Sequence, residues 1–133
     1  MVLAFKSKFV DKIKSGSKIH TIRSDNKNRW QPGLMIHFAT GVRTRMYHEF
    51  AKGVCIAIQD FEIKYDYEDR KTTAHVFVEN ELFGQVVWFD CCLKASSFSV
   101  DMLAANDGFS KVDDFFEWFD TDFKGKLIHW RLD

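Results

Sequence analysis

The stretch that decides the fold is GVCIAIQDFEIKYDY, residues 53–67. Its large apolar side chains are separated mostly by polar ones and stand at Val54, Ile56, Ile58, Phe61, Ile63 and Tyr65. Successive side chains of a strand point to opposite faces, so this partial alternation predicts a long half-buried β-strand. The sequence on either side of this strand therefore has to supply its hydrogen-bonding neighbours.

Further strands are expected before and after it. They cover residues 3–5, 34–40, 73–78, 85–93 and 127–132. A Pro32-Gly33 turn precedes the second of these strands, and a charged turn at residues 66–71 precedes the third. Several strands joined by short turns predict an antiparallel sheet that curls toward a barrel.

Helical periodicity is found in three places. Residues 7–15 form a short pattern that Gly16 ends, and residues 99–105 form another before an Asn-Asp-Gly turn. A phenylalanine stripe follows at Val112, Phe115, Phe116 and Phe119, with the spacing of an amphipathic helix that Gly125 ends. We interpret this stripe as core packing. The predicted fold class is α+β, a mixed β-barrel with two to three flanking helices.

Length and composition favour a single domain over residues 1–133. No apolar run approaches the roughly 18 to 20 residues that cross a bilayer, and charge appears by Lys6, too early for a secretory signal. We therefore expect no membrane partner and a cytoplasmic location. The three cysteines are odd in number and the five histidines are scattered, so we expect neither a disulfide framework, nor a metal site, nor a cofactor.

Charge is unevenly distributed although the chain is formally neutral. Residues 1–45 hold ten Lys or Arg against two acidic residues, a net charge of +8, and residues 46–133 carry −8. A basic end favours an anionic partner such as a phosphate or a nucleic acid. The alternative is that the two halves neutralise each other in the folded protein.

The segment GSKIHTIR, residues 16–23, concentrates polar chemistry directly after a predicted helix. In an extended chain Thr21 and Arg23 share one face, and His20 takes the other. Lys18 joins Thr21 only if the chain bends near Ile19. A site that contains both Lys18 and Thr21 therefore predicts a bend in the chain near Ile19.

The side chains of this segment suit a site for an anion or for acyl chemistry. Arg23 offers a planar fork of donors, and the hydroxyl of Thr21 binds a ligand or acts as a nucleophile. Lys18 is a general base only if its pKa falls from about 10.4 to roughly 7 or 8. The competing interpretation is a solvated lysine, a strand-forming threonine and an arginine paired with a surface carboxylate.

A second basic group, TGVRTR, occupies residues 40–45. Thr40, Gly41 and Arg43 would present hydroxyl, amide and guanidinium groups to an anion, although an ordinary hairpin turn explains the same residues. Trp30 either stacks on a nucleobase or lies in the core. We count these four residues, together with His20 and Arg23, as candidate ligand-binding residues.

A family resemblance rests on a pattern that begins in the segment above. It comprises Phe5, Phe9, Ile13, Gly16, Lys18, Thr21, Ile22, Arg23 and Gly33, and the later turn Asp107-Gly108-Phe109. This pattern resembles the ASCH domain superfamily, and the similarity spans nearly the full chain. The resemblance implies a PUA-like β-barrel and a domain that binds RNA or nucleosides.

A bacterial branch of that superfamily, similar to this motif, removes the acyl group from N4-acetylcytidine. The resemblance implies Lys18 as base, Thr21 as nucleophile and Asp107 as the acidic group, where that branch uses Glu. Aspartate is one methylene shorter, and a displacement of about an ångström costs roughly a hundredfold in rate. Three functions are therefore expected to compete: RNA or nucleoside binding, amidohydrolysis, and a protein-interaction domain without a ligand site.

Overall fold

The computed structural model describes all 133 residues and contains eight strands and three α-helices. The elements are β1 (Val2–Ala4), η1 (Ser7–Phe9), α1 (Val10–Ser15), β2 (His20–Arg23), β3 (Met35–Thr40), β4 (His48–Glu68), β5 (Lys71–Val78), β6 (Glu81–Phe89), β7 (Cys92–Ser96), α2 (Phe98–Asn106), α3 (Val112–Trp118) and β8 (Phe123–Leu132). The α+β class expected from the sequence is confirmed.

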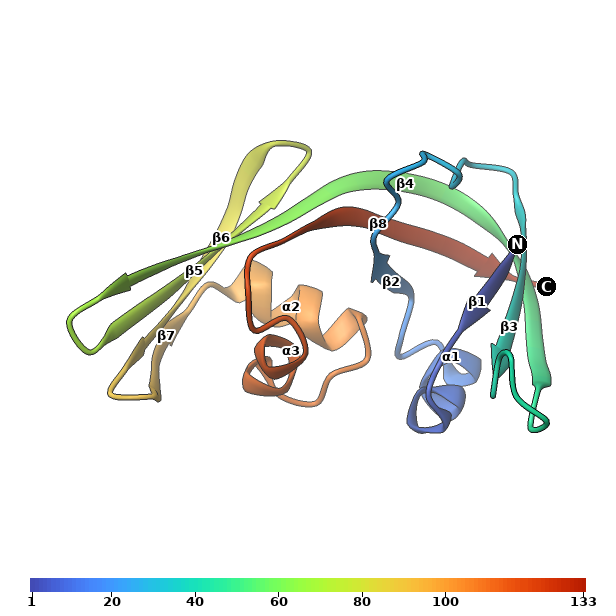
Figure 1. Cartoon of the computed structure of the whole chain (residues 1–133), viewed down its shortest axis with the longest axis horizontal. Helices are drawn as coiled ribbons and strands as arrows, with labels where there is room; N and C mark the ends of the chain where they lie inside the picture. The colour runs from blue at the N-terminus through green and yellow to red at the C-terminus, as the bar shows by residue number, and fades with distance from the viewer.

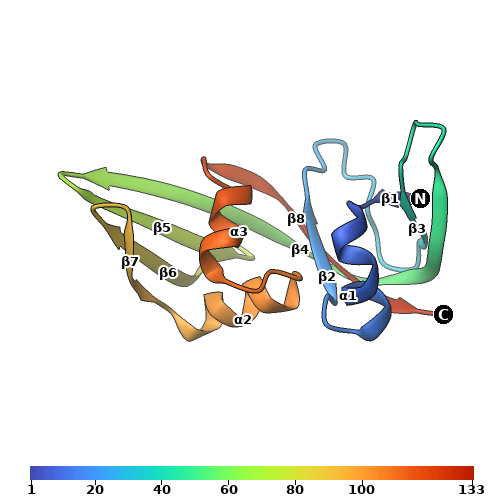
Figure 2. The same ribbon diagram turned by 90° about the horizontal axis from the view of Figure 1, so that it is seen from below.

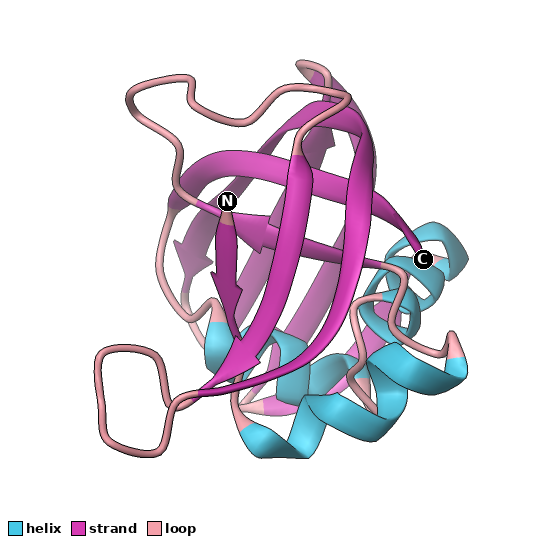
Figure 3. Ribbon diagram, turned by 90° about the vertical axis from the view of Figure 1, so that its right-hand side faces the viewer, coloured by secondary structure: helices cyan, strands magenta, loops and turns pink.

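All eight strands belong to one sheet organised by β4. This long strand pairs with β3 near its start, with β5 near its end and with β8 along its middle. β6 and β7 extend the sheet beyond β5, and β2 pairs with β8. The strands curve strongly around the core (Figure 3), but the pairing order does not close, because β1 pairs only with β3 and β2 only with β8.

Strand β4 confirms the extended structure predicted for residues 53–67 but departs from its apparent alternation. Cys55, Phe61 and Ile63 are buried, whereas Ile56 is 51% exposed. Its register with β8 shifts between Cys55 and Ala57, which places Ile56 as the extra residue of a β-bulge. The buried residues on either side of the bulge, Cys55, Phe61 and Ile63, all have odd numbers, so the even-numbered Ile56 is left outside the core.

The three α-helices lie on the concave side of the arch that β4 and β8 form (Figures 1 and 2). Phe115 and Phe116 are buried there, so the core interpretation of the phenylalanine stripe is confirmed. The helix ends at Trp118, however, and Gly125 lies inside β8. A Cβ on Gly125 would stand 2.4 Å from the backbone oxygen of Arg23, so this glycine permits close pairing of β2 and β8.

The strand expected over residues 85–93 is two strands. Asp90 and Cys91 adopt positive φ angles of 51° and 62° and form the tight turn between β6 and β7. Cys91 and Cys92 are consequently exposed at a hairpin tip, whereas Cys55 is buried. None of the helices has the length and apolar character that spanning a bilayer requires.

Candidate functional site

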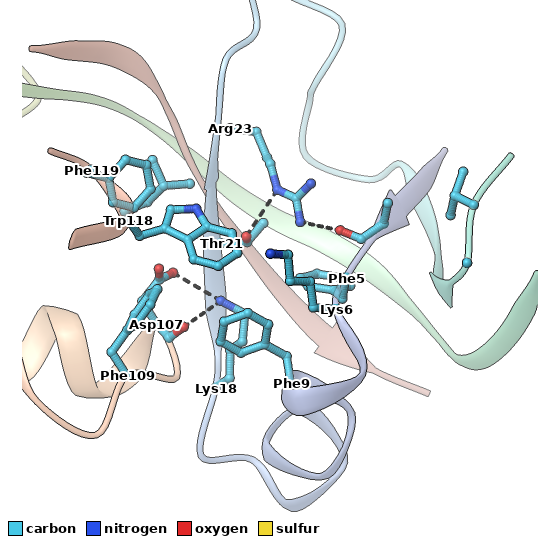
Figure 4. A pocket seen from close by; sticks show the side chains of 14 residues that line it. Phe5, Lys6, Phe9, Lys18, Thr21, Arg23, Asp107, Phe109, Trp118 and Phe119 are labelled. Atoms are coloured by element: carbon cyan, nitrogen blue, oxygen red, sulfur yellow. Dashed lines mark hydrogen bonds and ion pairs between the residues drawn. The ribbon is translucent and has the colours of Figure 1, made fainter. Parts of the chain in front are cut away.

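A cavity of about 360 Å³ opens where the segment at residues 16–23 meets the turn after α2 (Figure 4). Its walls come from β1, η1, β2, the loop after β3, the turn after α2 and the C-terminal end of α3. It is lined by Ala4, Phe5, Lys6, Phe9, Lys18, Thr21, Ile22, Arg23, Gly41, Val42, Asp107, Phe109, Trp118 and Phe119. Lys18, Thr21 and Asp107, predicted from distant parts of the sequence, therefore share one pocket.

Lys18 and Asp107 form a buried ion pair at the base of this cavity. The Lys18 Nζ donates to the Asp107 backbone oxygen at 2.6 Å and to its carboxylate Oδ1 at 3.3 Å. Both side chains are about 96% removed from solvent. Burial is the largest influence on the ammonium and lowers the pKa of Lys18 from 10.5 to about 8, against the opposing attraction of Asp107.

His20 contacts the same carboxylate from within β2. Its Nδ1 lies 3.0 Å from Asp107 Oδ1, and its ring meets His129 of β8 edge to face, with centroids 5.4 Å apart. His20 is 3% exposed and does not line the cavity. The structure therefore places His20 outside the lining of this cavity, and its role as a ligand-binding residue stays a prediction. The extended backbone of β2 turns its ring away from Thr21 and toward the buried carboxylate that it holds.

Thr21 and Arg23 share a face of β2, as the two-residue period predicts. Arg23 Nε donates to Thr21 Oγ1 at 3.3 Å, and Arg23 Nη2 donates to the backbone oxygen of Ala4 at 2.6 Å. The guanidinium carbon also lies 5.0 Å from the ring centre of Phe5. Arg23 thus occupies the cavity wall between β2 and β1, and burial lowers its pKa.

The chain does turn before β2, as a shared site for Lys18 and Thr21 requires. Residues 17–19 precede β2 and are not part of the strand. The Lys18 backbone N–H donates to the Lys12 oxygen at 2.9 Å, and that of Ile19 donates to the Asn106 oxygen at 2.8 Å. These two bonds tie the segment to α1 and to the end of α2. They allow Lys18 and Thr21 to face one cavity despite their odd spacing.

Asp107 is positioned by the turn that ends α2. Its backbone N–H continues the helical pattern by donating to Leu103, and Gly108 then adopts a left-handed φ of 94°. A Cβ at Gly108 would stand 3.0 Å from Lys18 Cδ. The acidic-Gly-Phe turn therefore brings its carboxylate against Lys18 because a glycine allows both the backbone conformation and the close approach.

Trp118 is a cavity residue that the sequence pattern did not reveal. It is 45% exposed at the end of α3 and packs edge to face on Phe9 and Phe109, with centroids 5.9 Å away in both cases. The Nζ atoms of Lys6 and Lys8 lie 4.9 Å and 5.2 Å from its ring centre. The sequence did contain one indication: Trp118 is not in the stripe of apolar residues predicted to be buried, so its indole could be expected at the surface.

The second basic group contributes less than expected. Gly41 lines the cavity together with Val42, but Thr40 and Arg43 do not. The Thr44 hydroxyl donates to the Gly41 oxygen at 2.6 Å, so the loop is a hairpin turn closed on itself. These bonds hold residues 41–44 in a compact turn, and Arg43 is exposed to solvent.

Trp30 is also not part of the cavity. Its ring packs against the hydrophobic core, and its backbone N–H donates to Asp25 Oδ2 at 3.0 Å. The core interpretation of Trp30 therefore applies. No group of three His, Cys, Asp or Glu side chains is arranged to hold a metal ion.

Comparisons with known proteins add no assignment to this geometry. No protein-family model, curated protein or solved structure matches the chain.

Proposed function

We propose that this cavity binds the base of a nucleoside, free or within single-stranded RNA. Its volume lies within the roughly 300 to 1,000 Å³ typical of small-molecule sites. Aromatic rings form much of the wall, and polar groups converge at the base. That composition suits a flat heterocycle with hydrogen-bonding edges better than it suits a simple anion.

The observation that carries the proposal is the convergence of opposite charges inside an apolar pocket. Lys18 and Arg23 supply donors, and Asp107 supplies acceptor lone pairs, within one cavity. A pyrimidine presents adjacent donors and acceptors along one edge, which such a set can match. The half-exposed indole of Trp118 offers a stacking surface at the rim, and Lys6 and Lys8 beside it favour a phosphate.

The proposal extends to the fold family. A divergent ASCH domain with a PUA-like barrel is supported by the strongly curved sheet and by the position of the acidic-Gly-Phe turn against Lys18. β1 and β2 are not hydrogen-bonded to each other, and this gap is the point at which the chain would depart from a closed barrel.

Calorimetric titration with cytidine, N4-acetylcytidine, their 5′-monophosphates and a short single-stranded RNA tests the proposal. We expect binding that Trp118→Leu weakens about tenfold, the scale of one stacking contact. Tyr67→Leu is the matched control, because Tyr67 is an exposed aromatic residue outside this cavity. No binding by any of these ligands at low salt, or equal affinities in both variants, would overturn the proposal.

The alternative is an amidohydrolase, favoured by one specific observation. Lys18 has a pKa of about 8 and faces the same cavity as Thr21. Neutral Lys18 would accept the Thr21 hydroxyl proton as Oγ1 attacks the acyl carbon. The C–N bond then breaks, the amine of cytidine leaves with a proton, and water hydrolyses the resulting threonyl ester.

Incubation of N4-acetylcytidine with the protein, followed by chromatography, separates turnover from binding. The alternative predicts release of cytidine, loss of at least about a hundredfold in rate in Thr21→Ala, and higher activity as Lys18 deprotonates between pH 7 and 9. Thr73→Ala, on the distant strand β5, is the control. Binding without release of cytidine would exclude the hydrolase and leave the binding proposal intact.

A further inference from the structure

A second cavity, of about 430 Å³, lies at the other end of the molecule and is aromatic and acidic. It forms where β4, β5 and β6 continue beyond the cover of α3, a region visible on the left of Figure 2. Four of its nine lining residues are aromatic and three are carboxylates, and none is Lys, Arg or His. This composition is opposite in sign to that of the Lys18 cavity.

Strand register places two of the rings on either side of a small residue. Thr72 pairs with Tyr67 on one side and with Trp88 on the other, so the three form one row across the sheet. Tyr67 and Trp88 are two strands apart, which sets their backbones about 10 Å from each other. The short side chain of Thr72 leaves a slot between the two rings.

Neighbouring side chains fix the positions of the two rings that form this slot. Tyr65 stacks on Tyr67 at 6.0 Å with an interplanar angle of 10°, and its hydroxyl donates to the backbone oxygen of Phe119. Trp88 Nε1 donates to Asp113 Oδ1 at 2.7 Å, which fixes the indole relative to α3. Tyr67 itself is 69% exposed, so one wall of the slot remains open to a ligand.

The carboxylates of this cavity favour a positively charged ligand. Asp113, Glu117 and Asp120 project from α3 and the residues after it into this cavity, and none of them forms an ion pair. Aromatic faces attract cations through the negative charge of their π-systems, and they favour cations that carry apolar carbon. A metal ion would instead require converging oxygen ligands, which the ring walls do not provide.

We propose that this cavity is a binding site for a small free alkylammonium ion of the quaternary type. The methyl groups of the cation lie between Tyr67 and Trp88, above Thr72. Glu117 and Asp120 balance its charge from the α3 side. The site is independent of the nucleoside proposal, since the two cavities share no residue.

The decisive experiment is a titration of ¹⁵N-labelled protein with choline chloride, followed through the indole N–H signals. Choline is expected to shift the Trp88 signal in a saturable manner and to leave Trp118 unchanged. 3,3-Dimethylbutan-1-ol has the same carbon skeleton without charge, and sodium chloride supplies charge without carbon. Both should produce less than a tenth of the response. An equal response to either, or a shift confined to Trp118, overturns the proposal.

Two variants test the walls separately. Tyr67→Leu should weaken choline binding about tenfold, and Glu117→Gln about threefold. Both positions are exposed, so the fold should be unaffected, and Tyr47→Leu in the hairpin turn before β4 is the matched control. Unchanged affinity in Tyr67→Leu refutes the site. Binding of a trimethyllysine peptide without any binding of choline refutes a free cation as the ligand.

Discussion

At the scale of single residues, two opposing influences act on the buried Lys18 ammonium. Desolvation disfavours its charged form, while the Asp107 carboxylate favours it, and desolvation is the larger effect. His20 Nδ1 is also hydrogen-bonded to Asp107 Oδ1, so one carboxylate contacts both Lys18 and His20. The desolvation of two buried charges can cost more free energy than their attraction returns, so this pair is weak evidence for stability and is better explained by a role in the site.

The lowered pKa of Lys18 predicts a rise in stability with pH. Below about pH 8 the lysine is protonated in both states, and the folded protein carries the full burial cost. Between about pH 8 and 10.5 the unfolded chain binds more protons, so the free energy of unfolding increases, by about 3 kcal/mol at most. Urea unfolding of the wild type and Lys18→Met measures this increase as their difference.

Taking the difference between wild type and Lys18→Met cancels the contribution of other groups that titrate in the same pH range. Burial raises the pKa of Tyr65, which opposes the lysine effect above about pH 10 but is common to both proteins. A parallel pH dependence of wild type and Lys18→Met would contradict the prediction.

At the scale of elements, the turn between α2 and α3 is what carries Asp107 into the site. Gly108 occupies a left-handed conformation there and lies against the aliphatic stem of Lys18. Phe109 follows and packs on Phe9 and Phe115, which anchors the turn between η1 and α3. Local backbone geometry and side-chain packing therefore determine together where the carboxylate points.

Gly108→Ala is expected to damage both stability and the site. Left-handed strain alone costs about 1 to 2 kcal/mol, and crowding against Lys18 adds about 1 kcal/mol or more. Gly33→Ala is a matched control, because Gly33 has a similar φ of 96° but nothing within 4 Å of the added methyl. Chemical denaturation and nucleoside titration should show a larger stability loss, and a loss of affinity, only for Gly108→Ala. Equal losses in the two variants would contradict this account.

At the scale of the whole molecule, one side chain bridges the two strands that leave the sheet open. β1 pairs with β3 and β2 pairs with β8, and no backbone pairing joins β1 to β2. The Arg23 guanidinium spans them by bonding to the Ala4 oxygen. The candidate site therefore lies at the open seam of the sheet.

Arg23→Met should loosen that seam. The aliphatic stem is retained while the donors are lost, so we expect about 1 kcal/mol of destabilisation. Amide exchange should accelerate in β1 and at Phe5 directly after it, whose N–H donates to the Ala39 oxygen. Arg70→Met is the control, since Arg70 is 67% exposed and its contact with Asp90 is 3.8 Å long. Identical exchange in both variants would show that Arg23 does not hold the seam.

Much of the fold could be predicted because its signals are local. Alternation identified β4, and helical spacing identified the buried face of α3. The errors arose where a local pattern had two solutions. Gly125 was assigned to a helix end although it serves strand pairing, and the tight turn at residues 90–91 lies inside the mostly apolar stretch 85–93 that was assigned to one strand. Both positions are explained only by a neighbouring strand.

The sequence by itself determined that polar side chains are concentrated at residues 16–23, and that Thr21 and Arg23 share a face of an extended chain. The tertiary structure alone decided that Asp107, 89 residues from Lys18, reaches it, that His20 holds that carboxylate, and that Trp118 forms the rim. Periodicity reports the direction of a side chain relative to its own backbone. Distances between segments depend on sheet curvature and helix packing, which arise from the whole chain.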